Sequence, residues 1–452
     1  MVNLVDKNVL VIGLARSGIS AIKLLHRIGA NVLAYDGKEK ENFENQIVDL
    51  MDKAAFHFGD FDYTILDETD LVVISPGVPT DLPFVTMARQ KGISIWSELE
   101  LAYKFYEGKL IAITGTNGKT TTTTLVGDIM KAFFEDVYVV GNIGLPFSEV
   151  VLETNKDTVV VAEVSSFQLE TIEQFRPDIS AILNITPDHL NRHKTMENYI
   201  ESKKRITLNQ TKEDVTILNY DDLHIRGVRD SIPSKMFFFS KTFRLGEGVY
   251  LHDDFINIIV NGSVYTICHV TDLKVLGIHN VENVMAAVAI SVHMGIPAPL
   301  ISKAIKAFTG VEHRTEYVTT INDVNYYNDS KATNPDAAIK GIESMIRPTV
   351  LIAGGMDKKN EFDEWIKAFN GKVKHLILFG ETKHIIDRTA KKYNFHNTII
   401  VNDLEEAVGK AKSLAKQGDC VLLSPACASW DMFESYEARG NLFKEYVVRT
   451  RL

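Results

Sequence analysis

Cysteine is scarce in this chain: Cys268, Cys420 and Cys427 are the only three in 452 residues. They lie far apart or at spacings that fit no metal-binding motif. No signal peptide is recognisable, so the sequence predicts free thiols in a reducing cytoplasm. This pattern excludes a small secreted domain held together by disulfides.

Three further absences narrow the function classes. No apolar run approaches the ~20 residues needed to span a bilayer, so membrane insertion is not expected. Low-complexity tracts and short repeats are missing. The formal net charge of −10 gives a nucleic-acid-binding surface no electrostatic support. We therefore expect a globular protein whose partners are neither nucleic acids nor membranes. A monomer is expected as well, although the sequence itself does not reveal the oligomeric state.

Apolar strands and helical stretches alternate along the chain, which is too long for one hydrophobic core of ~250–300 residues. Residues 1–105 begin with a strand at 8–12, a glycine turn, a helix and a strand at 31–35, a βαβ unit of parallel type. Further strands are expected at 70–75, 137–140, 158–164, 179–184, 215–219, 324–327, 350–353, 375–379, 398–401 and 419–423. The alternation predicts an α/β fold of three domains, at residues 1–105, 106–310 and 311–452. The first and third are expected to be Rossmann-like, and the second to be a P-loop-type ATPase domain.

Residues 111–121 read Ile-Ala-Ile-Thr-Gly-Thr-Asn-Gly-Lys-Thr-Thr, a strand that turns through glycines into a helix. Backbone N–H groups of such a loop converge on phosphate oxygens, while Lys119 can reach the β- and γ-phosphates and Thr120 can bind Mg²⁺. The positive end of the following helix points at the same anion. The generic motif has a glycine where Ile113 stands, and here the first glycine is Gly115, so the loop is shorter. The pattern predicts a nucleoside triphosphate site.

The turn at residues 13–18 is similar to a dinucleotide-binding fingerprint, with Asp36 following at a suitable distance. Ala15 replaces the middle glycine, however, which normally lets a pyrophosphate approach the backbone. Three interpretations stay open: an NAD site, a Rossmann-like site for another nucleotide diphosphate, and a turn that only packs a helix on a strand. Arg16 and Ser17 lie where the ends of the strands would meet such a ligand.

Polar residues follow several central strands. Glu163 ends an apolar strand, and a buried unpaired carboxylate costs several kcal/mol, so a cation such as Mg²⁺ is expected beside it. A helix-capping role is the alternative. Asp188 and His189 follow another strand and are candidates for metal or substrate contact. Lys203 and Lys204 lie on a basic helix, and the residue pattern alone favours neither.

The second half of the chain carries two more polar clusters. Asn280 and Asn283 lie one turn apart at the start of an apolar helix, where capping explains part of the pattern. Asp329, Lys331 and Thr333 alternate after a strand. Extended backbone would place all three on one face, which predicts an anchor for a small polar or charged ligand.

Residues 114–120, with their displaced first glycine, resemble the phosphate loop of the Mur ligase and folylpolyglutamate synthetase superfamily. Within it, residues 328–334 (Asn-Asp-Ser-Lys-Ala-Thr-Asn), 424–429 (Ser-Pro-Ala-Cys-Ala-Ser) and 75–77 (Ser-Pro-Gly) resemble the branch that adds D-glutamate to UDP-N-acetylmuramoyl-L-alanine. The resemblance covers essentially the whole chain. It implies an ATP-dependent, ADP-forming ligase of peptidoglycan synthesis, with the UDP-substrate on the first domain, ATP on the second and the amino acid on the third.

The resemblance also implies roles for individual residues. ATP would be bound by Thr116, Asn117, Gly118, Lys119, Thr120, Thr121, Thr122, Asn280, Arg314 and Asp329. The UDP-substrate would be bound by Arg16, Ser17, Asp36, Gly37, Lys38, Gly77, Asn142 and His189. D-glutamate would be bound by Lys331, Thr333, Lys358, Ser429 and Tyr436. Two Mg²⁺ ions are implied, with Thr120, Glu163, His189 and Lys203 as the metal-site residues. The implied catalytic residues are Lys119, Glu163, His189 and Lys203, with a CO₂-derived carbamate on Lys203. Tyr436 departs from the family, which often has Phe there.

The implied chemistry begins with attack of the substrate carboxylate on the γ-phosphate, which gives an acyl phosphate and ADP. The D-glutamate amine then displaces phosphate. Solvent, His189 or a phosphate oxygen can take the amine's proton, and the sequence does not choose among them. Three other functions stay open: a sibling ligase with another amino acid, an NAD-dependent dehydrogenase built on residues 1–105, and a regulatory ATP-binding module.

Overall fold

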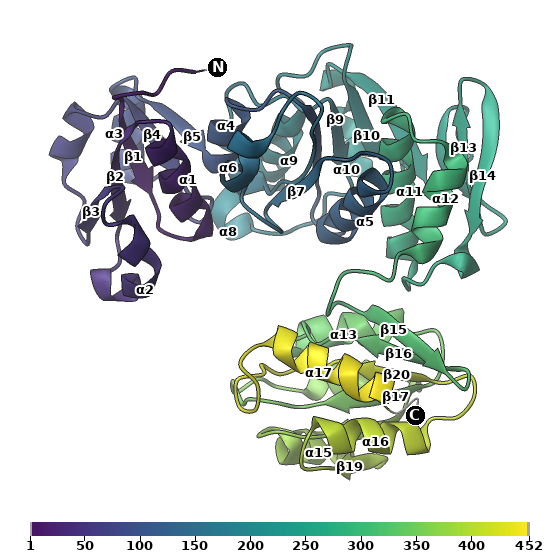
Figure 1. Cartoon of the computed structure of the whole chain (residues 1–452). Helices are drawn as coiled ribbons and strands as arrows, with labels where there is room; N and C mark the ends of the chain where they lie inside the picture. Colours follow the sequence, from purple (N-terminus) through teal and green to yellow (C-terminus); the bar gives the residue numbers. More distant parts are fainter. Residues whose placement is uncertain (1, 450–452) are drawn as a thin grey trace. The chain divides into compact units, whose positions relative to one another are not determined.

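The computed structural model describes residues 2–449, which form three sheets and two compact units (Figure 1). One unit runs to His269 and includes Glu282–Ala304, and it holds the first two sheets. The other unit comprises Val270–Val281 and the chain from Ile305 onward, and it holds the third sheet.

The first sheet is parallel, in the order β3-β2-β1-β4-β5. Its strands are β1 (Asn8–Ile12), β2 (Asn31–Asp36), β3 (Ala55–Phe58), β4 (Leu71–Ile74) and β5 (Ser94–Ser97). Its helices are α1 (Arg16–Arg27), α2 (Glu44–Ile47), α3 (Pro83–Gln90) and α4 (Glu98–Tyr103). The strand order reverses at β1 and β4, and ligands of such sheets bind in the crevice at the carboxyl ends of the strands there.

The second sheet has the order β14-β13-β12-β11-β10-β9-β6-β8-β7. Its parallel part comprises β6 (Lys109–Thr114), β7 (Val137–Gly141), β8 (Val159–Glu163), β9 (Ile179–Ile182), β10 (Val215–Asn219) and β11 (Lys235–Ser240). An extension follows, formed by β12 (Gly248–His252), β13 (Phe255–Val260) and β14 (Ser263–His269). The accompanying helices are α5 (Lys119–Lys131), α6 (Phe147–Val150), α7 (Ser166–Leu169), α8 (Leu190–His193), α9 (Met196–Lys204), α10 (Leu223–Val228), α11 (Ile278–His293) and α12 (Ala298–Ala307).

The third sheet has the order β15-β16-β20-β17-β18-β19, in which only the β15–β16 pair is antiparallel. Its strands are β15 (Glu316–Ile321), β16 (Val324–Asn328), β17 (Thr349–Ala353), β18 (Val373–Leu378), β19 (Thr398–Ile400) and β20 (Cys420–Leu423). Its helices are α13 (Pro335–Ser344), α14 (Asp363–Lys367), α15 (Lys383–Lys392), α16 (Leu404–Leu414) and α17 (Tyr436–Arg449).

Burial explains why the central strands are apolar without alternation. Every residue of β8, β9 and β17 is buried, as expected for parallel strands covered by helices on both faces. The predicted α/β fold is confirmed, with three sheets of mostly parallel strands. The prediction of alternation throughout is wrong for residues 248–269, where three consecutive strands pair antiparallel without helices between them. Within the described residues, no helix is long and apolar enough to cross a membrane.

Candidate functional site

The phosphate loop joins β6 to α5, as the sequence predicts. Gly118 precedes the helix at φ +82, a left-handed conformation that favours glycine. A Cβ atom at this position would lie 2.1 Å from the Oδ1 atom of Asn283. The loop is also held by Asn184, whose Oδ1 accepts from the Asn117 amide at 2.8 Å and whose Nδ2 donates to the Asn117 carbonyl at 3.0 Å. These contacts fix the backbone that would surround a phosphate group.

Two lysines meet at one carbonyl of this loop. The Nζ atom of Lys119 donates to the carbonyls of Gly115 and Thr116, both at 2.9 Å. The Nζ atom of Lys203, from α9, donates to the same Gly115 carbonyl at 2.8 Å. The structure therefore brings together two residues that lie far apart in the sequence. The positive charge of Lys119 and the N–H groups of both lysines at one end of the loop form an environment suited to an anion.

Lys203 is buried, with 2 % of its surface exposed, and its ammonium lies 4.7 Å from the centre of the Tyr199 ring. Burial, together with the nearby charge of Lys119, lowers the pKa of Lys203 to about 7. Lys204 instead is partly exposed and forms an ion pair with the exposed Glu201 at 2.6 Å. The two adjacent lysines therefore have different environments, and only Lys203 reaches the phosphate loop.

Glu163 ends β8 and is 1 % exposed. Its Oε1 atom accepts a hydrogen bond from Asn142 Nδ2 at 2.7 Å, and the Asn142 amide donates to the Glu163 carbonyl at 2.9 Å. Its Oε2 atom is buried and has no hydrogen-bond partner among the described residues. A buried carboxylate oxygen without a partner is costly, and a cation would satisfy it.

The other central candidates differ in exposure. His189 has φ +53 and a half-exposed side chain that lies 3.5 Å from Asp188 Oδ2, with its ring centre 5.0 Å from that of Phe167. Thr116 bonds through its hydroxyl to the Thr186 carbonyl and to the Tyr199 hydroxyl. Thr120 and Thr121 are partly exposed on the first turn of α5, whereas Thr122 is wholly buried. Among the described residues, no three His, Cys, Asp or Glu side chains form a ready metal site.

The two asparagines at the start of α11 have different surroundings. Asn280 donates through Nδ2 to the Leu276 carbonyl at 2.7 Å, a contact within its own unit. Asn283 is 5 % exposed, and its amide lies against Gly118 of the phosphate loop. Sequence reasoning assigned only Asn280 to the nucleotide. The spacing of the two asparagines one turn apart was the signal that pointed to Asn283 as well.

In the first sheet, Asp36 organises the glycine turn. Its Oδ2 atom accepts from the Leu14 amide at 2.9 Å and its Oδ1 atom from the Lys38 amide at 3.0 Å. The hydroxyl of Ser75 donates to the Gly13 carbonyl at 2.8 Å. Exposed candidates at this edge are Arg16, Gly37, Lys38 and Gly77, and Ser17 is partly exposed. Arg16 bonds to the carbonyl of Gly144, which belongs to the second sheet's domain.

The structure corrects the predicted extended run after β16, in the unit that holds the third sheet. Residues 329–333 form a turn, in which the Ala332 amide donates to the Asp329 carbonyl and the Thr333 amide to the Lys331 carbonyl. Asp329 is 5 % exposed, whereas Lys331 is half-buried, so the two do not share one open face. The prediction was wrong because the turn forms its own backbone hydrogen bonds.

Asp329 uses both carboxylate oxygens inside the protein. Its Oδ1 atom accepts from the Thr315 amide at 3.0 Å, and its Oδ2 atom accepts from the Ser424 hydroxyl at 2.8 Å. Burial raises the pKa of Asp329 to about 7. Asp329 thereby fixes the turn that carries the exposed Arg314.

A buried arginine that sequence reasoning missed connects two loops of candidate residues. Arg439, on α17, donates to the Ser330 hydroxyl and carbonyl at 2.9 and 2.8 Å, and to the Cys427 and Ala428 carbonyls at 3.1 and 3.3 Å. It is 0 % exposed, and burial lowers its pKa to about 10. The loop after β16 and the loop after β20 are therefore held together by one guanidinium group.

The amino-acid candidates lie on these loops and next to them. The Nζ atom of Lys331 lies 5.6 Å from the centre of the Tyr436 ring, and that of Lys358 lies 4.4 Å from the centre of the Trp430 ring. Ser429 is 2 % exposed and precedes Trp430, which is 64 % exposed. Burial raises the pKa of Tyr436 to about 12, so its hydroxyl keeps its proton at neutral pH. The Thr333 side chain is partly exposed on the same turn as Lys331.

Comparison with known proteins places this geometry in a family. Residues 7–97 match the model described as Mur ligase MurD-like, N-terminal domain; residues 113–291 match Mur ligase middle domain; residues 313–427 match Mur ligase, glutamate ligase domain. The UDP-N-acetylmuramoylalanine–D-glutamate ligase of Lachnoclostridium phytofermentans is 52% identical over 98% of this chain and 98% of its own. The chain belongs to the Mur ligase family. The ligase of the same name from Clostridioides difficile is 47% identical over 98% of this chain and 99% of its own.

Solved structures of Mur ligases share the fold at low identity. UDP-N-acetylmuramate-alanine ligase MurC from Thermotoga maritima matches with a TM-score of 0.57 and 19% identity, over 98% of this chain and 99% of its own. The MurF ligase from Thermotoga maritima, solved in complex with ADP, matches with a TM-score of 0.55 and 15% identity over the whole of both chains. The three-sheet architecture is thus that of Mur ligases. The matching family models and the named relatives, in turn, show that the chain is an ATP-dependent ligase.

Proposed function

We propose that this chain ligates D-glutamate to UDP-N-acetylmuramoyl-L-alanine with ATP, which yields UDP-N-acetylmuramoyl-L-alanyl-D-glutamate, ADP and phosphate for peptidoglycan synthesis. The observation that carries the proposal is the 52% identity, over nearly the full length of both chains, with a ligase named for this activity. The loop that joins β6 to α5, with Lys119, supports the use of ATP. Residues 1–105 would bind the UDP-substrate, 106–310 ATP and 311–452 D-glutamate, in a monomeric cytoplasmic enzyme.

The first proposed step forms an acyl phosphate. A carboxylate oxygen of the substrate's terminal alanine attacks the γ-phosphorus of ATP, and the bond from that phosphorus to the β-phosphate bridging oxygen breaks, so that ADP leaves. The step brings two anions together, and positive charge must offset their repulsion. Lys119 is placed to supply this charge, because its ammonium already lies against the phosphate-loop carbonyls of Gly115 and Thr116.

The second proposed step forms the amide. The D-glutamate ammonium first gives one proton to solvent, His189 or a phosphate oxygen. The resulting amine nitrogen attacks the acyl carbon, the carbon–oxygen bond to phosphate breaks, and the nitrogen gives a second proton to the departing phosphate or to solvent. Lys331, Thr333, Lys358, Ser429 and Tyr436 would hold the amino acid, with the two lysine ammonium groups facing its two carboxylates. Arg439 supports this arrangement, since it ties together the loops that carry Lys331 and Ser429.

The residues present fit Mg²⁺. Glu163 offers a buried carboxylate oxygen without a partner among the described residues, and Thr120 and His189 would complete the donor set with Lys203 in two sites. When bound, Mg²⁺ would offset the negative charge of the phosphate and acyl oxygens. Lys203 as an ammonium would repel a metal ion. A carbamate there, formed from CO₂ and the neutral amine, would instead supply an anionic oxygen, and the pKa of about 7 gives Lys203 that neutral amine near neutral pH.

Amino-acid choice tests the proposed function. We expect phosphate release with UDP-N-acetylmuramoyl-L-alanine and D-glutamate, and less than about 1% of that rate with L-glutamate, since each tenfold in rate needs only about 1.4 kcal/mol. Fixing both carboxylates would direct the amine of the L-enantiomer away from the acyl carbon. The measurement is initial phosphate release across D-glutamate, L-glutamate, L-alanine and a diamino acid. Equal rates with the two enantiomers would contradict the assignment.

Lys358 tests the pocket itself. Losing one charge-assisted hydrogen bond of about 1.5–3 kcal/mol should raise the KM for D-glutamate by about 10- to 100-fold in Lys358→Ala, with a smaller change in the KM for ATP. Lys359→Ala is the matched control, because it removes the neighbouring exposed lysine. Equal effects of the two variants on the KM for D-glutamate would argue against the pocket.

A further inference from the structure

Arg192 links the domain of the first sheet to the domain of the second sheet through several hydrogen bonds. From α8 of the second domain, its Nε and Nη2 atoms contact the two carboxylate oxygens of Glu170 at 3.2 and 2.7 Å. Its Nη1 atom donates to the Pro76 carbonyl at 2.8 Å, and its Nη2 atom also donates to the Val78 carbonyl at 3.1 Å. Its guanidinium lies 4.3 Å from the centre of the Phe167 ring. The planar group is thus held on its edges and on one face.

Glu170 is the second half of this link. Its Oε2 atom also accepts from the Thr80 hydroxyl at 3.1 Å, so the carboxylate contacts the first domain directly. The side chains of Arg192 and Glu170 are 15 % and 14 % exposed. A bidentate, largely buried pair of this kind fixes the relative position of its two side chains, whereas an exposed ion pair leaves them free to move.

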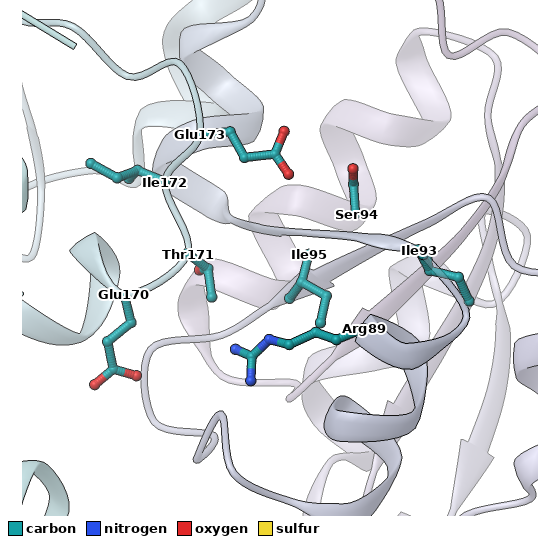
Figure 2. A pocket seen from close by; sticks show the side chains of 9 residues that line it. Arg89, Ile93, Ser94, Ile95, Glu170, Thr171, Ile172 and Glu173 are labelled. Atoms are coloured by element: carbon teal, nitrogen blue, oxygen red, sulfur yellow. The ribbon is translucent and has the colours of Figure 1, made fainter. Parts of the chain in front are cut away.

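The link borders a cavity between the two domains. A space of about 330 Å³ is lined by Arg89 and residues 92–95 of the first domain and residues 170–173 of the second, and Figure 2 shows Glu170 and Arg89 among its lining side chains. Arg89 donates to the Thr80 carbonyl at 2.8 Å. Polar contacts join the two domains beside this open pocket, both at residues 76–80 and where the Ser97 amide donates to the Thr171 carbonyl at 3.3 Å.

A second contact between the domains has a different character. There Ser148 of α6 donates through its hydroxyl to Ser20 of α1 at 2.8 Å, and its amide donates to the buried Glu98 carboxylate at 2.6 Å. These contacts lie within a continuous apolar core that includes Leu99 and Phe147. The packed side fixes where the domains join, and the link through Arg192 and Glu170 fixes the orientation of residues 76–80 relative to α8.

We infer that Arg192 and Glu170 are positioning residues for the UDP-substrate, an inference that rests on the proposed function. The loop at 75–77 is proposed to hold the UDP end, and His189, which directly precedes α8, the end near the reacting carboxylate. Arg192 contacts the loop at residues 76–78 from α8, the helix that directly follows His189. A small change in the spacing between them would misplace a substrate bound at both ends, which is costly for catalysis.

The test compares Arg192→Lys and Glu170→Gln with the wild type by steady-state kinetics with UDP-N-acetylmuramoyl-L-alanine, ATP and D-glutamate. Each variant keeps side-chain volume but loses the bidentate geometry or the charge. We expect the KM for the UDP-substrate to rise about 10-fold or more, with the KM values for ATP and D-glutamate within about 2-fold of the wild type. The double variant should be no worse than the poorer single variant, because both changes break one link.

Arg176→Lys is the matched control. Arg176 makes a similar bidentate contact to Asp214, at 2.8 and 3.2 Å, but entirely within the second domain. This control should leave all three KM values unchanged. Calorimetric titration of each variant with the UDP-substrate alone gives a second readout, in which the dissociation constant should rise as KM does.

Two results would overturn the inference. One is an unchanged KM and dissociation constant for the UDP-substrate in folded Arg192→Lys and Glu170→Gln. The other is a loss shared equally by all three substrates and by the melting temperature, which would mark the pair as structural only. A wild-type enzyme that releases no phosphate with these substrates would instead refute the proposed function, and the calorimetric titration separates the two failures.

Discussion

Replacing Lys119 by Ala should reduce ADP formation by about 1000-fold or more while leaving the fold intact, since removing one preorganised stabilising group from a developing anion costs about 100- to 1000-fold even without a full charge. The Lys119 ammonium donates to the loop carbonyls of Gly115 and Thr116 at 2.9 Å, and its side chain is partly exposed rather than part of an apolar core. The change should therefore affect chemistry much more than stability. Coupled-assay turnover and thermal melting measure the two effects separately.

Lys131→Ala is a matched control for this variant. Lys131 is the last residue of the same helix, α5, and is exposed, so its loss changes the net charge by the same amount at the opposite end of the helix. Turnover of Lys131→Ala should stay within about 2-fold of the wild type, as expected for a surface change. Near-normal turnover of Lys119→Ala would refute the phosphate-site assignment.

Replacing Lys203 by Ala should lower turnover by about 100-fold or more, and acetate or formate should restore part of it. The reason is the proposed carbamate, whose loss removes an anionic oxygen from the metal site, and a free carboxylate can replace that oxygen. Removal of a buried side chain with 2 % exposure also leaves a space that a small acid can enter. The measurement is turnover against the concentration of acetate, with chloride at equal ionic strength as the salt control.

The pH dependence of this site has a definite sign. CO₂ reacts with the neutral amine, and burial lowers the pKa of Lys203 from the ordinary 10.5 to about 7, so the neutral form becomes the main one above that pH. Activation by bicarbonate should therefore rise as pH increases through about 7, whereas an ordinary lysine would remain protonated. Lys204→Ala is the internal control, because Lys204 forms a surface ion pair with Glu201. An inactive Lys204→Ala beside an active Lys203→Ala would show that the roles are reversed.

Local sequence patterns predicted most of the parallel strands. The strands at 8–12 and 215–219 were predicted with the bounds that the structure gives, and most of the other predicted strands differ by one or two residues at an end. These strands are continuous apolar runs between glycine, proline or polar residues, and such a run is recognisable without its neighbours. The antiparallel strands at 248–269 were missed, as were the strands at 55–58, 94–97, 235–240 and 316–321. β14 has an exposed, mixed surface without such a run, whereas the apolar run of β13 went unassigned.

The short spacings between residues of one loop were also sufficient to predict the phosphate site from the sequence. The residues from Lys109 to Thr120 form a strand, a turn and a helix start in one continuous segment, so the sequence alone determined their relation to one another. The run from Asp329 to Thr333 is equally short, yet its conformation was predicted wrongly. Its backbone forms a turn that also bonds to His313, and a contact with a distant residue leaves no mark in the local pattern.

What the sequence by itself determined is the class of protein: a globular α/β chain with a nucleoside triphosphate loop and polar residues at the ends of its strands. Only the tertiary structure decided which of two adjacent lysines reaches that loop, that Glu163 keeps one buried oxygen without a partner among the described residues, and that Arg439 ties two loops together. It also placed Arg192 between two domains. The physical reason is that burial and charge pairing depend on side chains brought together from distant positions, whereas periodicity and turn chemistry act between near neighbours.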